Sequence, residues 1–72
     1  MMTFKQLEAI YWVTQLGGFS QAADKLHTTQ SAISKRVQEL ETLFNMPLFD
    51  RTQRTSRLTE KGEEMYVVAK KL

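Results

Sequence analysis

The run AADKLHTTQSAISKRVQELETLF, residues 22–44, decides the fold of this 72-residue chain. Small apolar residues at helical spacing end at Leu26, where the tight junction His27-Thr28-Thr29 interrupts the pattern. A second helix follows, with Thr28 or Thr29 as its N-cap, and its apolar stripe recurs at steps of four, three and four residues: Ile33, Val37, Leu40 and Phe44. Two helices joined by a short turn, the second polar on its exposed side, are typical of a helix-turn-helix, here over about residues 19–38.

The residues before this motif predict another helix, over residues 3–16. Its main apolar stripe is formed by Phe4, Leu7, Ile10 and Tyr11, and Trp12 and Leu16 lie on a different side. Two apolar sides are typical of a helix packed between two partners. Gly17-Gly18 ends this helix, because glycine readily adopts the left-handed cap conformation. Ser20 is predicted to be the N-cap of the short helix that follows.

The residues after the motif predict a turn, a small β-hairpin or loop, and a last helix. Asn45 can close the long helix in the left-handed region, and Pro47 prevents its continuation. The polar stretch 51–57 contains three arginines and no acid. Thr59 is the predicted N-cap of the last helix, whose apolar stripe runs to the end of the chain: Met65, Val68, Ala69 and Leu72.

These elements predict one mainly α domain with the winged helix-turn-helix architecture. A three-helix core and a small β-hairpin wing occupy residues 1–58, and residues 59–72 are the start of a linker or dimerisation helix. Hydrophobic residues make up 42% of the chain and charged residues 25%, which is an ordinary globular balance. A core of this size is marginal, and such domains often gain stability by oligomerising.

Composition excludes several classes of function. The chain has no cysteine, which excludes disulfides and cysteine-based zinc sites, and His27 is its only histidine. We interpret His27 as a turn residue that tolerates a positive φ. There is no paired-carboxylate site, phosphate-binding glycine loop or nucleophile–base pair, so no enzyme, metal or cofactor is expected. No secretory signal and no membrane-spanning segment is expected either, and a reducing cytoplasm is compatible.

The outer side of the long helix carries the candidate function. At 100° per residue, four hydrogen-bonding side chains face away from the apolar stripe, and a fifth stands at the N-terminal edge: Ser31, Ser34, Lys35, Gln38 and Gln30. Such side chains can reach base edges in a major groove. The acids Glu39 and Glu41 lie in the second half of the helix, so insertion of the first half keeps them away from phosphates. Taken alone, the same pattern is more typical of an ordinary solvated face.

The arginine stretch is the second basic feature. Its three arginines can grip a DNA backbone or enter a minor groove, and the alternative is a solubilising surface loop. With Lys25, Lys35 and Arg36 they make six basic groups that could share one face. The net charge of +2 is only mildly basic and does not by itself indicate nucleic-acid binding. The distribution of the basic groups over the surface has to decide whether the chain binds nucleic acid.

In order and spacing, the chain resembles the N-terminal domain of LysR-type bacterial transcriptional regulators. The matching residues extend over nearly the whole chain: Ala22-Ala23, Leu26, Gln30-Ser31-Ala32-Ile33-Ser34, Val37, Leu40-Glu41, Pro47-Leu48-Phe49-Asp50-Arg51, Arg54, Leu58-Thr59 and Gly62. Two positions depart from the family pattern. Ser31 stands where proline is usual, and Phe44-Asn45 replaces the usual Leu-Gly.

The resemblance implies sequence-specific binding of double-stranded promoter DNA by a symmetric homodimer. The third helix would lie in the major groove, with these contact residues: Thr29, Gln30, Ser31, Ser34, Lys35 and Gln38. The wing and its surroundings would hold the backbone or minor groove through Thr28, Arg36, Arg51, Arg54 and Arg57. Dimerisation would use the stripe of the last helix: Met65, Val68, Ala69 and Leu72. In this family the complete protein continues into a co-inducer-binding domain, which is absent from this chain. The alternative hypothesis is a helical module for protein contacts, in which mutation of Gln30 or Arg54 leaves partner binding intact.

Overall fold

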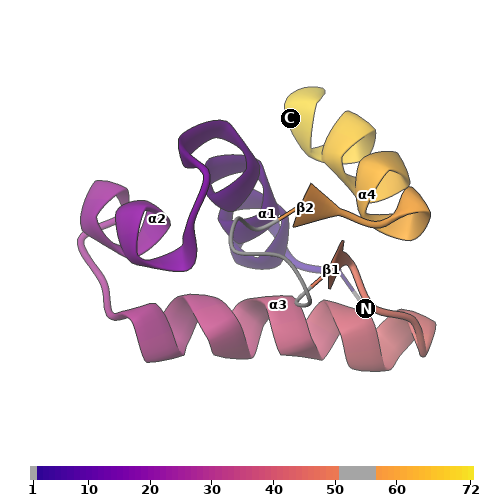
Figure 1. Ribbon diagram of the computed structural model, residues 1–72, viewed down its shortest axis with the longest axis horizontal. Coiled ribbons are helices and arrows are strands. Elements are labelled where there is room, and N and C mark those ends of the chain that lie inside the picture. The colour runs from indigo at the N-terminus through magenta and orange to yellow at the C-terminus, as the bar shows by residue number, and fades with distance from the viewer. Residues whose placement is uncertain (1, 51–56) are drawn as a thin grey trace.

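The computed structural model describes residues 2–50 and 57–72 of the chain. Four helices and two short strands follow in the order α1 (Phe4–Leu16), α2 (Phe19–Lys25), α3 (Gln30–Phe44), β1 (Phe49–Asp50), β2 (Arg57–Leu58) and α4 (Glu60–Lys70). The strands pair antiparallel, with Phe49 opposite Leu58 and Asp50 opposite Arg57. Figure 1 shows α3 as the lowest layer, with the other elements above it. The predicted helical core and hairpin are confirmed.

Helix α1 lies at the centre of the molecule and packs against α2, α3 and α4. Ala9, Ile10 and Val13 are fully buried. Of the predicted second side, Trp12 packs against the core, whereas Leu16 is 42% exposed at the end of the helix, so that side is covered only in part. Phe4 departs from the predicted stripe, because its side chain is 62% exposed. The helix begins with a capping box, in which Thr3 accepts from the Gln6 N–H and Gln6 Oε1 accepts from the Thr3 N–H. It ends at Gly17, whose φ of 84° lies in the left-handed region, as predicted.

The start of α2 corrects one prediction. Ser20 is not the N-cap, since the helix begins one residue earlier at Phe19, and Gly18 occupies the cap position without a side-chain hydrogen bond. The physical reason lies in the packing of Phe19, whose ring meets the ring of buried Phe49 edge-on at 5.5 Å. This aromatic contact outweighs the preference for a capping hydroxyl.

The turn between α2 and α3 follows the predicted chemistry. His27 has a positive φ of 55°, and the next N–H, of Thr28, donates to the carbonyl of Ala23 at 2.9 Å. Of the two candidate caps for α3, Thr29 is the one used, because its hydroxyl accepts from the Ala32 N–H at 3.1 Å. These bonds fix where α3 begins relative to α2.

Helix α3 is anchored by its predicted stripe. Ile33, Val37 and Leu40 are fully buried, and Phe44 is half-buried at the end of the helix. Asn45 closes the helix with a φ of 54°, as expected from the sequence. Because this side of α3 is buried in the core, the opposite side faces outward and is accessible to a binding partner.

Helix α4 packs against α1 and begins beside the hairpin. Thr59 caps it as predicted, since its hydroxyl accepts from the Gly62 N–H at 3.1 Å. Two residues of the predicted dimerisation stripe, Met65 and Ala69, are buried in this chain's own core at 4% and 7% exposure. Val68 and Leu72 remain exposed, at 39% and 67%. The stripe is therefore divided between the core and the surface.

Candidate nucleic-acid interface

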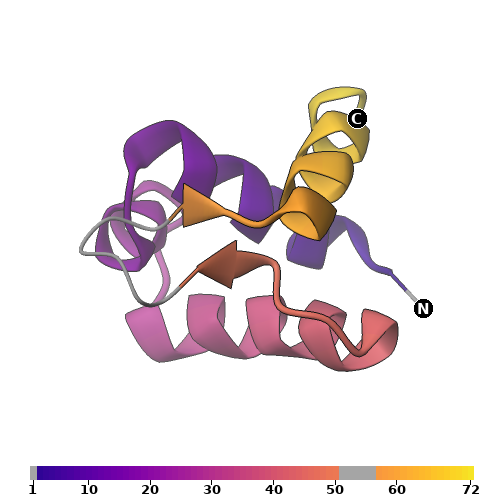
Figure 2. The same cartoon turned by 45° about the vertical axis from the view of Figure 1, so that its right-hand side comes forward.

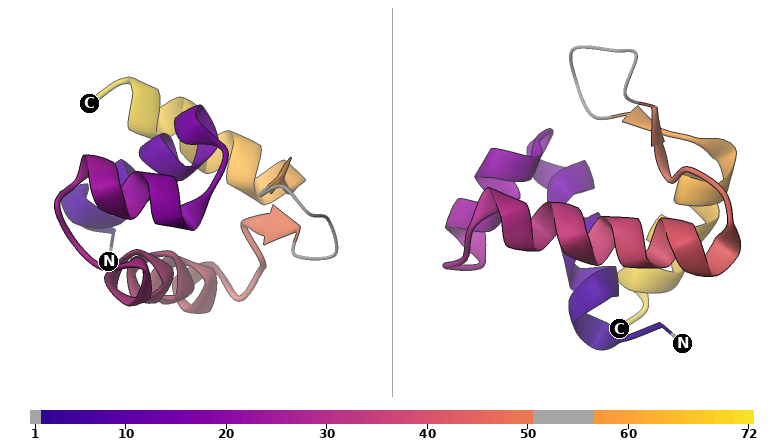
Figure 3. Two further views of the ribbon diagram at one scale, coloured as in Figure 1. Left: turned by 60° about the vertical axis from the view of Figure 1, so that its left-hand side comes forward. Right: turned by 90° about the horizontal axis from the view of Figure 1, so that it is seen from below.

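The outer side of α3 is a continuous polar surface. Thr29, Gln30, Ser31, Lys35 and Gln38 are exposed, and Ser34 is half-buried. Figure 3 (right) views the molecule from this side, and α3 lies in front of the other elements. No other helix covers this surface among the residues that the structure describes. The structure thus brings the six predicted major-groove residues together on the N-cap of α3 and the stretch from Gln30 to Gln38, where their donors and acceptors can face a common partner.

The two acids in the second half of α3 are held by contacts within the domain, which sequence reasoning missed. Glu39 Oε1 accepts from Gln6 Nε2 at 3.0 Å, and Glu41 Oε2 accepts from the Leu48 N–H at 2.9 Å. Gln6 could have been found from the Thr3-x-x-Gln6 capping pattern, which places a buried amide at the start of α1. Both carboxylates therefore help to orient α3 within the fold.

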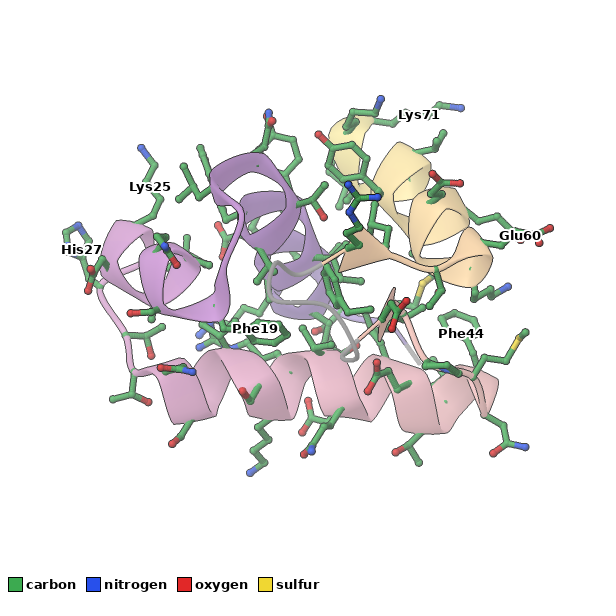
Figure 4. The ribbon with its side chains drawn as sticks, viewed as in Figure 1. Phe19, Lys25, His27, Phe44, Glu60 and Lys71 are labelled. Atoms are coloured by element: carbon green, nitrogen blue, oxygen red, sulfur yellow. The ribbon has the colours of Figure 1, made fainter. Side chains whose placement is uncertain are left out.

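The basic groups do not all share one face, which corrects the sequence-based grouping. Lys25 Nζ lies 4.7 Å from the centroid of the Trp12 ring, and Figure 4 shows its side chain pointing away from α3. The cation is attracted to the electron-rich face of the indole, so Lys25 covers α1. Lys35 is exposed on α3, and Arg36 beside it is half-buried. Thr28, also predicted to contact the DNA backbone, is half-buried at the turn before α3.

The hairpin strands flank α3. Seen from the outer side of α3, they lie beside the helix rather than behind it (Figure 3, right). Figure 2 shows the same two strands above α3, next to the start of α4. Arg57 is exposed on β2, opposite Asp50 on β1. Arg51 and Arg54, predicted to serve the wing, lie outside the described residues.

A separate apolar surface lies where α1 meets the end of α4. An open pocket of about 270 Å³ is lined there by aromatic, aliphatic and charged side chains: Phe4, Glu8, Tyr11, Trp12, Ala69, Lys70 and Leu72. Tyr11 stacks on Tyr66 of α4 at 5.9 Å, and this contact holds the two helices together. The pocket belongs to different helices from the polar surface of α3.

Residues 2–50 and 57–72 contain no cluster of three or more potential metal-ligating side chains. Within the same ranges, no helix has both the length and the apolar character needed to cross a membrane.

Comparison with known proteins places this arrangement in a family. A family model described as "Bacterial regulatory helix-turn-helix protein, lysR family" matches residues 4–63. An HTH-type transcriptional regulator of Azotobacter vinelandii is 44% identical over 64 residues, which cover 89% of this chain and 44% of that protein. The chain thus spans less than half the length of this relative.

Solved structures agree with the sequence match. The crystal structure of a LysR family transcriptional regulator has a TM-score of 0.88 and 42% identity, and the match covers 99% of this chain and 24% of that one. The BenM DNA-binding domain in complex with catB site 1 DNA has a TM-score of 0.91 and 31% identity, over 97% of this chain and 78% of that one.

A helical core, an accessible helix after a tight turn and a flanking hairpin define a winged helix-turn-helix domain. With its match over residues 4–63, the chain belongs to the LysR family of bacterial regulatory helix-turn-helix proteins, which is a family of transcription regulators and not of enzymes.

Proposed function

We propose that this chain is the DNA-binding domain of a transcriptional regulator and binds double-stranded promoter DNA in a sequence-specific manner. The observation that carries the proposal is the polar outer side of α3, which is accessible along the half that holds Gln30 and Lys35. The complex formed with DNA by the related BenM domain supports it. In this proposal residues 1–58 form the DNA-binding unit and residues 59–72 begin a linker helix.

The first half of α3 enters the major groove. Gln30 and Gln38 carry amides that can pair with adenine in two hydrogen bonds, and Lys35 can donate to guanine or to a phosphate. Ser31 and Ser34 are short enough to allow close approach of the helix. The free N–H groups at the start of α3, beside Thr29, suit a phosphate oxygen.

The residues beside α3 hold the DNA backbone. Thr28 and Arg36 flank the first half of the helix, and Arg57 extends from the hairpin that lies next to it. Arg51 and Arg54 are assigned to the same role from their sequence positions. These cations make the affinity fall with salt, because each phosphate that they neutralise releases counterions.

Dimerisation is assigned to the exposed part of the α4 stripe. Val68 and Leu72 are accessible, whereas Met65 and Ala69 are committed to the core of this chain. Leu72 also lines the open pocket between α1 and α4, which gives a second copy an accessible surface next to this part of the helix. A homodimer of this kind suits a partly palindromic site with two half-sites.

The remaining assignments follow from membership of the family. The domain works without a catalytic site, a metal or a cofactor. The co-inducer is bound by a further domain of the complete regulator, and the protein acts in the cytoplasm on the nucleoid.

A binding experiment tests the sequence-specific role of α3. Duplexes are selected from a random library with the wild-type domain, and fluorescence anisotropy then compares the selected duplex with a scrambled one over a salt series. Gln30→Ala is expected to weaken binding to the selected duplex by about tenfold or more and to leave the scrambled duplex almost unaffected.

Gln15→Ala is the matched control, because Gln15 is an exposed glutamine on α1 whose amide is bonded to the Tyr11 hydroxyl. It should bind both duplexes as the wild type does. Absence of duplex binding by the wild type, even at low salt, would overturn the proposal and favour a module for protein contacts.

A further inference from the structure

The end of α3, the base of the hairpin and the start of α4 meet at one junction. Thr59 joins the last two, since its hydroxyl donates to the Pro47 carbonyl at 2.7 Å and its N–H donates to the Leu48 carbonyl at 3.0 Å. Lys61 of α4 lies 4.7 Å from the centroid of the Phe44 ring, at the end of α3. Three elements are therefore tied together within a few residues of the hairpin.

Glu41 makes a side-chain contact from α3 to the base of the hairpin. Its Oε2 accepts from the Leu48 N–H at 2.9 Å, and β1 begins at the next residue, Phe49. Leu48 itself is fully buried, and its carbonyl is the one that accepts from Thr59. Both backbone groups of Leu48 are thus engaged, one toward α3 and the other toward the residue that follows β2.

We propose that Glu41 is a positioning residue for DNA binding. It sets the distance between the outer side of α3 and the hairpin strands β1 and β2, which are called the wing below. The inference rests on the proposed function, because the distance matters only if α3 and the wing contact the same duplex. Glu41 itself does not contact the DNA in this account. It acts through Leu48, whose N–H it holds.

The negative charge of Glu41 and its hydrogen bond to Leu48 are expected to change the DNA affinity in opposite directions, which makes the proposal testable. A carboxylate on a helix that docks onto DNA is repelled by the phosphates, so removal of the charge alone should leave the affinity unchanged or raise it. Loss of the bond to Leu48 should lower the affinity, because the wing is no longer held in place. The two effects have opposite directions and can be separated by two conservative variants.

Glu41→Gln removes the charge and keeps an amide oxygen at the same reach, so it can still accept from the Leu48 N–H. Glu41→Asp keeps the charge but shortens the side chain by one C–C bond of about 1.5 Å, which takes the carboxylate out of hydrogen-bond range of Leu48. Glu39→Gln and Glu39→Asp form a matched control pair, since Glu39 is an acid of the same helix that is bonded to Gln6 rather than to the hairpin.

Three measurements are made on each variant. Urea denaturation establishes the folded fraction, amide hydrogen exchange by NMR reports on the Leu48 N–H, and anisotropy gives the affinity for the selected and scrambled duplexes. Glu41→Asp should speed exchange at Leu48 by about tenfold and weaken binding of the selected duplex by about threefold to tenfold. Glu41→Gln should match the wild type in exchange and bind equally well or more tightly.

Several results would overturn the inference. Folded Glu41→Asp that binds as the wild type does rejects the positioning role, and so does Glu41→Gln that loses as much affinity as Glu41→Asp. A loss that is fully accounted for by the unfolded fraction, or that also appears in the Glu39 pair, reduces Glu41 to a stability element. If the wild type itself binds no duplex, the proposed function fails first and the positioning role falls with it.

Discussion

Replacement of Gly62 by alanine is expected to destabilise the domain, although alanine is the better helix former. Gly62 is buried in the first turn of α4. A Cβ atom there would overlap the carbonyl oxygen of Leu48 and lie 2.9 Å from Cδ2 of Leu58. The carbonyl cannot move freely, because it accepts the Thr59 N–H at the base of the hairpin. The steric conflict is therefore with backbone that is already fixed.

The magnitude follows from opposing contributions. Alanine in place of glycine gains about 1 kcal/mol within a helix. Overpacking of a filled interior costs about 1–3 kcal/mol, and weakening of the Leu48–Thr59 hydrogen bond costs about 1 kcal/mol more. The net effect is a loss of about 1–3 kcal/mol in the free energy of unfolding, which corresponds to a fall in Tm of about 5–20 °C for a domain of this size.

Circular dichroism with thermal and urea denaturation measures this effect directly. Gly18→Ser is the matched control, since the three atoms nearest to a Cβ at Gly18 all belong to the side chain of Gln21, which is exposed and able to move. Serine also supplies a capping hydroxyl at the start of α2, so this variant should be as stable as the wild type or more so. A Gly62→Ala protein that melts at or above the wild-type temperature would refute the steric argument.

Further predictions concern caps and charge. Thr59→Ala should cost about 1–2 kcal/mol in urea denaturation, because it removes both the cap of α4 and the bond to Pro47, whereas Thr59→Ser should retain most of the stability. Asn45→Ala should cost about 1 kcal/mol, since alanine lacks the polar side chain that makes a φ of 54° tolerable, and Asn45→Gly should not. Arg57→Ala should lower the slope of log affinity against log salt by about one, and an unchanged slope in the anisotropy series would remove Arg57 from the DNA backbone contacts.

The fold was predictable wherever a local pattern decides the structure. Apolar periodicity located α3, and residues with a distinct backbone preference marked its boundaries, namely His27 and Thr29 before it and Asn45 after it. Each of these signals depends only on residues within one or two helical turns. It can therefore be interpreted without knowing which other elements pack against the helix. The outer side of α3 could be identified for the same reason, as the side opposite the stripe.

The wrong predictions occur where a residue far away in the sequence determines the local structure. Ser20 is the better capping residue by local preference, yet α2 begins at Phe19 because the ring of Phe49, thirty positions further along the chain, packs against it. Charge alone groups Lys25 with the other cations, but its ammonium lies over the ring of Trp12 on another helix and points away from α3. The capping pattern at Thr3 points to Gln6, but nothing in the sequence pairs Gln6 with Glu39 or the Leu48 N–H with Glu41.

The last helix shows a further limit of periodicity as a signal. An apolar stripe predicts that one side of a helix is covered, but it does not say which chain covers it. In α4 the stripe serves this chain's own core at Met65 and Ala69, and it reaches the surface at Val68 and Leu72. Substitutions at the two pairs should therefore act on different properties. Those at the buried pair disturb folding, whereas those at the exposed pair leave the fold intact and affect only what docks on it.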